Sequence, residues 1–403
     1  MKLMTKSGET PDLAAFIGRV EPLTRAHEEN IQCGLDSSRH MAALLGSAYE
    51  PRTFRNPFYE SERAEMIRAA FPNEPRLHIL PLEDSNYNLN EWIERTQSTV
   101  NGVWDTIRVN NPDEAKKPHV SLIGHSKDAT SFYLDLFPKW DSINTPNFHS
   151  GLNATAIRHK IFGSMAMVQD YLAGDGAEDP TPAYLRKYGE RALQQADMFL
   201  SAEAKLAAEG RGDLSSGVVS WLRDFVHTET KFRAVTDEYA FVAKYNWQWK
   251  DAPYPPKFVT VDLCIVKAGR ILLVERKGYP GKGLLAMPGG HLDENERIIT
   301  GCVREAREET GLRVPEAILL GNSVLRKSDG SAATEYFDDP FRSSRGRTIT
   351  HVLFVHLPPG GPDPKVRPSS DAKRADWHDL SALNRRDFFE DHYPIIRNLT
   401  ARI

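Results

Sequence analysis

The stretch that most constrains this chain is residues 290–312, GHLDENERIITGCVREAREETGL, which indicates a loop leading into one amphipathic helix. Asp293 with Glu296 three residues later is typical of a helix start, and Gly311 is typical of a helix end. Apolar residues recur on one face of this helix, and such a face is suited to packing on a sheet. A loop and helix held against a sheet is therefore the first structural prediction.

The other face of the predicted helix carries Glu305, Glu308 and Glu309, because helical residues advance by about 100° each. Three neighbouring carboxylates repel one another unless a cation lies among them. Oxygen ligands of this kind suit Mg²⁺ or Mn²⁺, which commonly bridge to phosphate oxygens. Three glutamates alone are more often a solvated acidic face, so the metal interpretation depends on the rest of the pattern.

The whole stretch resembles the Nudix box, Gly-x5-Glu-x7-Arg-Glu-U-x-Glu-Glu-x-Gly-U with U apolar, at every specified position. The resemblance implies a hydrolase that uses divalent metal to cleave a nucleoside diphosphate linked to another moiety. It also implies that the three glutamates are catalytic metal ligands. Glu296 and Arg304 resemble the pair that braces the loop and the helix in that family.

Length and composition place limits on the remaining chain. The 403 residues suffice for two or three domains, and a net charge of −4 gives no reason to expect nucleic acid or membrane as a partner. Three cysteines, an odd number without metal-ligand spacing, argue against a disulfide framework. No apolar run is long enough for a signal peptide or a membrane span. We therefore expect a cytoplasmic enzyme, and a homo-oligomer remains possible.

In the N-terminal part, apolar runs alternate with helical patterns. Residues 13–18, 41–47 and 119–124 indicate buried strands, and helices are expected from near His27 and near Glu60. This alternation predicts a Rossmann-like α/β domain with a parallel sheet and a site at the carboxyl ends of its strands. The loop after the first strand, GRVEPLTRAH, combines a glycine with a helix N-terminus, an arrangement suited to phosphate.

Residues 18–27 resemble the Gly-Arg-Phe-Gln-Pro-Phe-His-x-Gly-His motif of the nicotinamide mononucleotide (NMN) adenylyltransferases, members of the nucleotidylyltransferase superfamily. The resemblance extends to residues 51–53, 56–58 and 124–128, and to the Asn-x-Thr-x-x-Arg pattern of residues 153–158. It fits the subgroup whose chain continues into a Nudix domain. The departures from the first motif are Val20, Glu21, Leu23, Thr24 and Ala26.

This second resemblance implies adenylyl transfer from ATP to NMN. Attack on the α-phosphorus of ATP needs positioning and positive charge around the phosphate oxygens, so His27 and Arg158 are the implied catalytic residues. Asn88 and Trp92 fall where the family places NMN, although Trp92 as plain core is the alternative. The implied ATP- and phosphate-binding residues are Gly18, Arg19, Thr24, Gly124, His125, Lys127, Asp128, Asn153, Thr155 and Arg158.

A break rich in glycine, proline and acidic residues, GDGAEDPTP, lies at residues 174–182 and indicates a boundary. Helical patterns follow over 183–209 and 216–245. The segment 174–215 resembles an insertion, whether a lid, a dimer contact or decoration, and the second pattern resembles the subgroup's connector. We expect a nucleotidylyltransferase domain over 12–173, a helical insertion and connector over 174–254, and an α/β/α Nudix domain over 255–403.

The Nudix part should contain strands at 258–266, 270–277 and 348–357, and a helix around 379–390. An arginine-rich loop before the third strand resembles that of ADP-ribose-hydrolysing Nudix domains. Solvated loop arginines are the default interpretation, but these side chains are also candidates for holding a diphosphate or a terminal ribose phosphate. The candidate substrate-binding residues of this part are Gly289, Gly290, Arg342, Arg345 and Arg347, and weaker candidates for a further metal ligand or base are Glu335, Asp338 and Asp339.

Together the motifs predict a bifunctional enzyme of NAD metabolism. One domain would make NAD and pyrophosphate from NMN and ATP, and the other would hydrolyse ADP-ribose to AMP and ribose 5-phosphate. One alternative is a Nudix hydrolase of another nucleoside diphosphate derivative with a non-catalytic, nucleotide-sensing N-terminal domain. A second alternative is a sensor that binds ADP-ribose uncut and acts on DNA, and the complete set of metal carboxylates counts against it.

Overall fold

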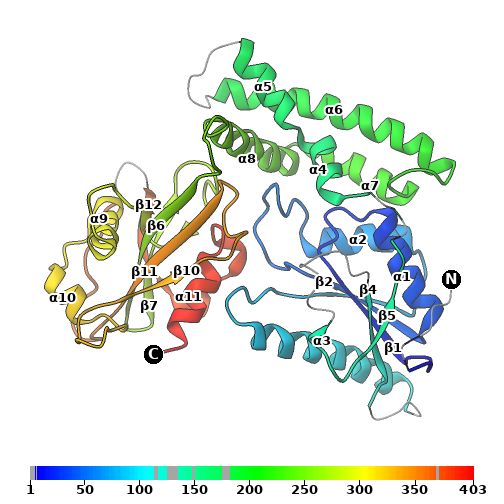
Figure 1. The fold of residues 1–403 in the computed structure, drawn as a ribbon, viewed down its shortest axis with the longest axis horizontal. Helices are drawn as coiled ribbons and strands as arrows, with labels where there is room; N and C mark the ends of the chain where they lie inside the picture. The colour runs from blue at the N-terminus through cyan, green and yellow to red at the C-terminus, as the bar shows by residue number, and fades with distance from the viewer. Residues whose placement is uncertain are drawn as a thin grey trace. The chain divides into compact units, whose positions relative to one another are not determined.

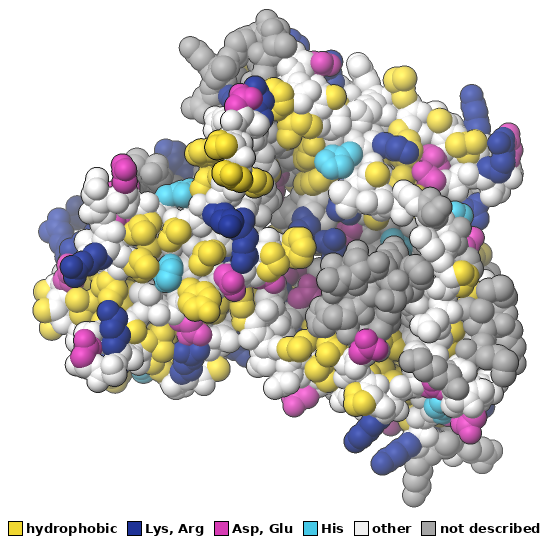
Figure 2. Space-filling model, in the orientation of Figure 1, with side chains coloured by type: hydrophobic (Ala, Val, Ile, Leu, Met, Phe, Trp, Pro, Cys, Tyr) yellow, Lys and Arg dark blue, Asp and Glu magenta, His cyan; other side chains and the backbone are white. Residues whose placement is uncertain are grey.

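The protein is described from a computed structural model in which the chain forms two compact units, Met1–Tyr239 and Ala240–Ile403 (Figure 1). Each unit has its own β-sheet. On the face drawn in Figure 2, basic and acidic side chains are interspersed. Among the described helices, none combines the length and apolar character needed to cross a bilayer. The residues that the structure describes are 5, 7–112, 117–124, 135–147, 149, 151–174, 182–368 and 372–403.

The first unit contains a parallel sheet of five strands, in the order β3 (Leu77–Pro81), β2 (His40–Leu45), β1 (Leu13–Gly18), β4 (Val120–Gly124) and β5 (Asp141–Asn144). The central strand β1 is an apolar run with its first five residues buried, as expected for a parallel strand covered on both faces. The chain steps outward from β1 to β3 and then crosses to β4 on the other side of β1. The order of the strands therefore reverses between β1 and β4.

Three helices cover this sheet, namely α1 (Arg25–Ser37), α2 (Glu60–Ala70) and α3 (Leu89–Asn110). On one face, Val103 and Trp104 of α3 share a buried cluster with Leu13 and Ala15 of β1. On the opposite face, α1 and α2 cover the sheet (Figure 1). This arrangement confirms the prediction of a Rossmann-like layer structure.

The other helices before β6 (Lys257–Lys267) are α4 (Ala154–Phe162), α5 (Met165–Gly174), α6 (Pro182–Ala208), α7 (Ser216–Val226) and α8 (Glu229–Trp247). Helix α7 contacts α2, and α8 runs from the first unit into the second (Figure 1). The single helix predicted over 216–245 is wrong. The amide of Thr228 closes a tight turn on the carbonyl of Phe225, and the carbonyl of Thr228 accepts the first amides of α8. The side chain of threonine can hydrogen-bond nearby backbone groups in non-helical conformations, so threonine favours helix starts over helix interiors. The helical pattern is therefore interrupted at Thr228.

The second unit contains a mixed sheet, whose main path is β10 (Thr334–Phe337), β11 (Arg347–Leu357), β6 (Lys257–Lys267), β7 (Arg270–Arg276) and β12 (Ala372–Asp379). The short strands β8 (Leu285–Ala286) and β9 (Gly289–His291) pair with β7 and β6. The helix of the glutamate stretch, α9 (Ile298–Thr310), buries Cys302 and Val303 against Val261 of β6. The remaining helices are α10 (Glu316–Gly321) and α11 (His392–Thr400).

The start of α9 differs from the prediction of a helix that begins at Asp293. The helix begins at Ile298, and the preceding residues form a turn in which the amide of Asp293 donates to Glu296 (3.0 Å). The carboxylate of Glu296 also accepts from Arg304 further along the helix, so it ties this turn to α9. Gly311 does end the helix, with a left-handed φ of 59°.

The helix predicted around 379–390 is also wrong. Two short 3₁₀ turns occupy that region, η2 (Leu380–Ala382) and η3 (Arg385–Asp387). The side chains of Asp379 and Asn384 accept the amides of Ser381 and Arg386, and these local bonds compete with a continuous helix.

Candidate active sites

The carboxyl edge of the first sheet carries the predicted phosphate residues Gly18 and Gly124. They are the last residues of β1 and β4, the neighbouring strands between which the strand order reverses. Loops that leave such a pair of strands diverge and open a crevice where ligands bind in doubly wound α/β folds. His125, Lys127 and Asp128, which follow Gly124, lie outside the described residues.

Thr24 and His27 form the start of α1. Thr24 is the residue before the helix, and its amide donates to Nδ1 of His27 at 3.1 Å. The threonine hydroxyl lies 3.0 Å from the same nitrogen. Because Nδ1 accepts the amide proton, the neutral imidazole carries its own proton on Nε2. Helix capping therefore fixes both the orientation and the tautomer of His27.

Arg158 is held at the start of α4, and only 4% of it is exposed. The side chain of Asn153 caps this helix by accepting the amides of Thr155 (2.7 Å) and Ala156 (3.3 Å). Arg158 donates from Nη1 to the carbonyl of Glu21 at 2.6 Å and from Nη2 to the hydroxyl of Thr155 at 2.8 Å. The structure thus brings the Asn-x-Thr-x-x-Arg motif to the loop that follows β1.

Positive charge accumulates at this loop. Burial, aided by the charge of Arg19, lowers the pKa of Arg158 to about 10. Arg158 Nε and Arg19 Nη1 are buried and have no hydrogen-bond partner among the described residues. Buried guanidinium nitrogens with unsatisfied donors are costly unless an anion pairs with them, so the site fits a polyphosphate.

Asn88 and Trp92 both have structural contacts. The side chain of Asn88 caps α3 by accepting the amide of Glu91 at 3.1 Å. Trp92 is partly buried against the core of the first unit, with its ring 6.1 Å from that of Phe137. The assignment of these two residues to an NMN pocket stays a prediction.

In the second unit, Glu296 and Arg304 lie in contact through two guanidinium nitrogens. Nη2 of Arg304 donates to Glu296 at 2.6 Å, and Nε donates at 3.0 Å. Nη1 of Arg304 also donates to Glu305 and to Glu308, each at 2.9 Å. One guanidinium therefore ties the loop before α9 to two of the three glutamates.

The third glutamate, Glu309, accepts the amide of Gly289 at 2.9 Å. Burial raises its pKa to about 7 and also raises the pKa of Glu305. Arg304 and Gly289 bind the three carboxylates separately. In the described part of the chain, no three acidic, histidine or cysteine side chains are placed closely enough to hold a metal ion. At Glu305 and Glu309 burial outweighs the nearby charges of Arg304 and Arg276, so this donor set fits a divalent cation.

The positions 289 and 290 require glycine for space. A Cβ on Gly289 would lie 2.2 Å from Oδ1 of Asp262, and a Cβ on Gly290 would lie 2.5 Å from Oε1 of Glu305. The backbone of β9 therefore lies directly against the carboxylates of Asp262 and Glu305.

The three loop arginines have three different environments. Arg342 is buried in a two-bond ion pair with Asp391, and both bonds are 2.9 Å. Arg347 pairs at the surface with Asp338 at 3.2 Å. Only Arg345 keeps a loose ion pair, 3.9 Å from Glu390, and a buried Nε without a hydrogen-bond partner among the described residues.

Comparisons with known proteins agree with these two sites. The NUDIX domain family matches residues 256–399. The chain is 36% identical over 153 residues, 38% of its length, to a nicotinamide/nicotinic acid mononucleotide adenylyltransferase of Acinetobacter baylyi, of which it covers 76%. It is 34% identical over 140 residues, 35% of its length, to an ADP-ribose pyrophosphatase of Methanocaldococcus jannaschii, of which it covers 71%.

A solved structure spans both units. It is a bifunctional NMN adenylyltransferase/ADP-ribose pyrophosphatase from Francisella tularensis complexed with AMP and a manganese ion, 27% identical, with a TM-score of 0.72 and coverage of 97% of this chain and 99% of that chain. This chain belongs to the bifunctional NMN adenylyltransferase/Nudix family. Dependence on a divalent metal is consistent with that membership.

Several residues at the Nudix cavity of this family member escaped the sequence analysis. The lining includes the predicted Glu309 and Arg345, and also Asp262, Arg276, Glu390 and His392, which were not predicted. Arg276 and Arg345 lie over the ring of Phe389, with guanidinium carbons 4.1 and 5.7 Å from its centre. A charged residue inside the apolar run 258–266 is the signal that would have found Asp262. The others lie on elements whose sequence gives no comparable signal.

Proposed function

We propose that this chain is a bifunctional enzyme of NAD metabolism, with synthesis assigned to residues 12–173 and hydrolysis to residues 255–403. The helices of residues 174–254 serve as insertion and connector. The observation that carries the proposal is that each unit holds its own charged site: Arg19 and Arg158 with buried guanidinium nitrogens at the carboxyl edge of the first sheet, and partly buried carboxylates on α9 in the second.

The first reaction joins NMN and ATP. A phosphate oxygen of NMN attacks the α-phosphorus of ATP, the bond to the β-phosphate breaks, and NAD and pyrophosphate form. Arg19 and Arg158 balance the charge of the phosphates, and the Nε2 proton of His27 donates to an oxygen at the reacting phosphorus. Thr24 and Asn153 support the reaction through the helix starts that they cap.

The remaining assignments in the first unit follow the family resemblance. Asn88 and Trp92 bind NMN, and the backbone at Gly18 and Gly124 leaves room for phosphates at the strand ends. Thr155 adds a hydroxyl donor at the start of α4. The other phosphate-binding residues of this proposal, outside the described part of the chain, are His125, Lys127 and Asp128.

The second reaction is hydrolysis of ADP-ribose to AMP and ribose 5-phosphate. Water attacks one phosphorus of the diphosphate, and the bond to the bridging oxygen breaks. Glu305, Glu308 and Glu309 would hold Mg²⁺ or Mn²⁺, which supplies charge neutralisation and lowers the pKa of a bound water. Arg304 orients the carboxylates, and Arg345 with Arg276 balances the charge of the diphosphate from the other side of the cavity.

A pair of assays on one preparation tests the proposal. Purified protein with Mg²⁺ should form NAD and pyrophosphate from NMN and ATP, and should release AMP from ADP-ribose. Glu308→Gln removes a charge from an exposed side chain, so the fold should persist. We expect this variant to lose hydrolysis by about 10²-fold or more while NAD synthesis survives.

Two results would contradict the assignment. Loss of both activities in folded Glu308→Gln protein, or of neither, would remove the two-site interpretation. If the wild-type protein cleaves ADP-ribose but forms no NAD, the first unit binds nucleotide or acts on another substrate.

A further inference from the structure

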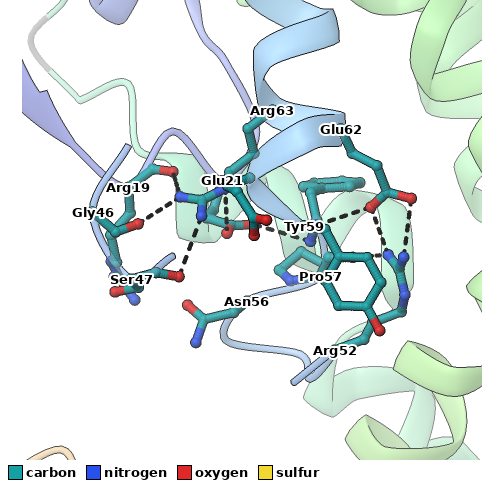
Figure 3. A network of polar contacts seen from close by, with 12 residues as sticks. Arg19, Glu21, Gly46, Ser47, Arg52, Asn56, Pro57, Tyr59, Glu62 and Arg63 are labelled. Carbon is teal, nitrogen blue, oxygen red and sulfur yellow. Dashed lines mark hydrogen bonds and ion pairs between the residues drawn. The ribbon is translucent and has the colours of Figure 1, made fainter. Parts of the chain in front are cut away.

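The loop after β1 contains an acidic residue, Glu21, close to the arginines that we assign to ATP. Its side chain is 1% exposed and lies against Arg63 of α2, which is also 1% exposed (Figure 3). Oε1 of Glu21 lies 3.3 Å from Nε of Arg63, and Oε2 accepts the amide of Phe58 at 3.2 Å. Burial raises the pKa of Glu21 to about 8, and the charge of Arg63 is the main effect that opposes this rise, so the two side chains depend on each other in this loop.

Arg63 also joins the loops that follow two neighbouring strands. Its Nη1 donates to the carbonyl of Arg19 in the loop after β1. The same nitrogen donates to the carbonyl of Gly46 at 2.7 Å, and Nη2 donates to that of Ser47 at 3.2 Å, both after β2 (Figure 3). One buried guanidinium therefore holds three carbonyls and one carboxylate.

Two residues at these contacts have a strained backbone. Val20 has a φ of 56° and Ser47 has a φ of 50°, values in the left-handed region. A β-branched valine rarely adopts this conformation, which persists only where the surroundings impose it. Arg63 binds the carbonyl that precedes Val20 and the side chain that follows it, so Arg63 holds this residue from both sides.

The same loop supports Arg158, because the backbone carbonyl of Glu21 accepts Nη1 of that arginine. We propose that the Glu21–Arg63 pair is a positioning clamp for ATP: Glu21 orients Arg63, and Arg63 fixes the loop that places Arg19 and supports Arg158. The clamp rests on the adenylyl transfer proposed above. Glu21 and Arg63 are positioning residues in it, since neither is assigned a contact with substrate.

Four proteins test the clamp: wild type, Glu21→Gln, Arg63→Met and the double variant. The readouts are the Kd of Mg-ATP by calorimetry and the KM for ATP in NAD formation. Arg63→Met removes the hydrogen bonds to all three carbonyls and loosens the loop, so both constants should rise by about 10²-fold. Glu21→Gln removes the ion pair but keeps the carbonyl bonds of Arg63, and the expected rise is about tenfold.

The double variant provides the decisive comparison. Glu21 acts through Arg63, so its loss adds nothing once Arg63 is gone, and the double variant should bind ATP within about twofold of Arg63→Met. Independent contributions would instead multiply to a rise of about 10³-fold in the double variant, and that result would overturn the clamp. If Arg63→Met does not fold, Arg63→Lys replaces it; this variant keeps the charge but not the fork of donors, and an unchanged Kd would count against the clamp.

Glu62→Gln is the matched control on the same helix. Glu62 is a buried carboxylate that pairs with Arg52 (2.9 Å) and Lys231 (2.8 Å), and it makes no hydrogen bond or ion pair with Arg19, Val20 or Glu21 among its described contacts. Its removal should leave the Kd of ATP within about twofold, and a rise equal to that of Arg63→Met would also overturn the proposal. If the wild type forms no NAD, the proposed synthesis fails, while the series of Kd values still decides the clamp.

Discussion

The buried ion pair between Arg342 and Asp391 gives a prediction about stability. Each side chain is 4% exposed, and Asp391 accepts two hydrogen bonds of 2.9 Å from the guanidinium. Asp391→Asn keeps the shape of the side chain but leaves Arg342 buried without this counter-charge. Removal of one partner from a buried pair typically costs about 3–5 kcal/mol, because the remaining charge stays desolvated.

The size of the effect follows from the unit that carries the pair. For a domain of this length, 1 kcal/mol corresponds to about 2–4 °C, so the transition of the second unit should fall by on the order of 10 °C. Urea unfolding, followed by hydrogen exchange in peptides of β6 and β11, reports the second unit alone. Asp338→Asn is the matched control, because its pair with Arg347 is 53% and 32% exposed and should contribute less than about 1 kcal/mol.

A double replacement separates charge from packing. Arg342→Met with Asp391→Leu removes both charges, and such replacements of buried pairs are often neutral within about 1–2 kcal/mol. If Asp391→Asn costs no more than Asp338→Asn, the argument from burial is refuted. Arg342 would then be available as a substrate ligand after all.

Three further predictions concern the two reactions and the response to pH. Chelation of divalent metal should abolish AMP release. Arg304→Met should lower AMP release by about 10–100-fold with NAD synthesis unchanged, because Arg304 orients Glu305 and Glu308. Loss of NAD synthesis in Arg304→Met would argue for global unfolding. His27→Ala should lower the kcat of NAD formation by about 10²–10³-fold with AMP release unchanged, and a normal rate of synthesis would exclude His27. Burial, aided by the charge of Arg342, lowers the pKa of His392 well below its usual value, so the folded unit keeps this ring neutral while the unfolded chain protonates near pH 6.5. The contribution of His392 to the free energy of unfolding is therefore complete above about pH 6.5 and is lost as the pH falls, by up to about 1.4 kcal/mol per pH unit. Urea unfolding between about pH 5 and 8 should show a weaker dependence of this free energy on pH in His392→Asn than in the wild type. The same dependence in both proteins would contradict the assignment.

Local sequence signals predicted the parts of the fold whose partners lie close along the chain. Gly311 ends α9 with a left-handed residue, and Asn153 caps α4 through amides two and three residues later. The prediction of a helix around 379–390 was wrong for a reason that is also local in the sequence. The side chains of Asp379 and Asn384 accept nearby backbone amides and form short turns instead. Apolar periodicity by itself does not include this competition.

Contacts between distant residues escaped the sequence analysis. Glu21 was visible only as a departure from a family motif, and its partner Arg63 lies on another helix, in a stretch that carries no motif. Similarly, Arg276 and Glu390 reach the Nudix cavity from β7 and from the turn before α11. A side chain that meets its partner only after folding leaves no pattern at a fixed spacing.

By itself, the sequence determined the family and the chemistry, because the Nudix box and the Asn-x-Thr-x-x-Arg motif are local patterns whose residue types are tied to metal and phosphate. Only the tertiary structure decided what each charge does. Arg342, Arg345 and Arg347 lie within six residues of one another, yet one forms a tight buried ion pair, one keeps a loose ion pair and one pairs at the surface. Burial and distant partners make this difference, since a charge removed from water must find a counter-charge wherever packing places it.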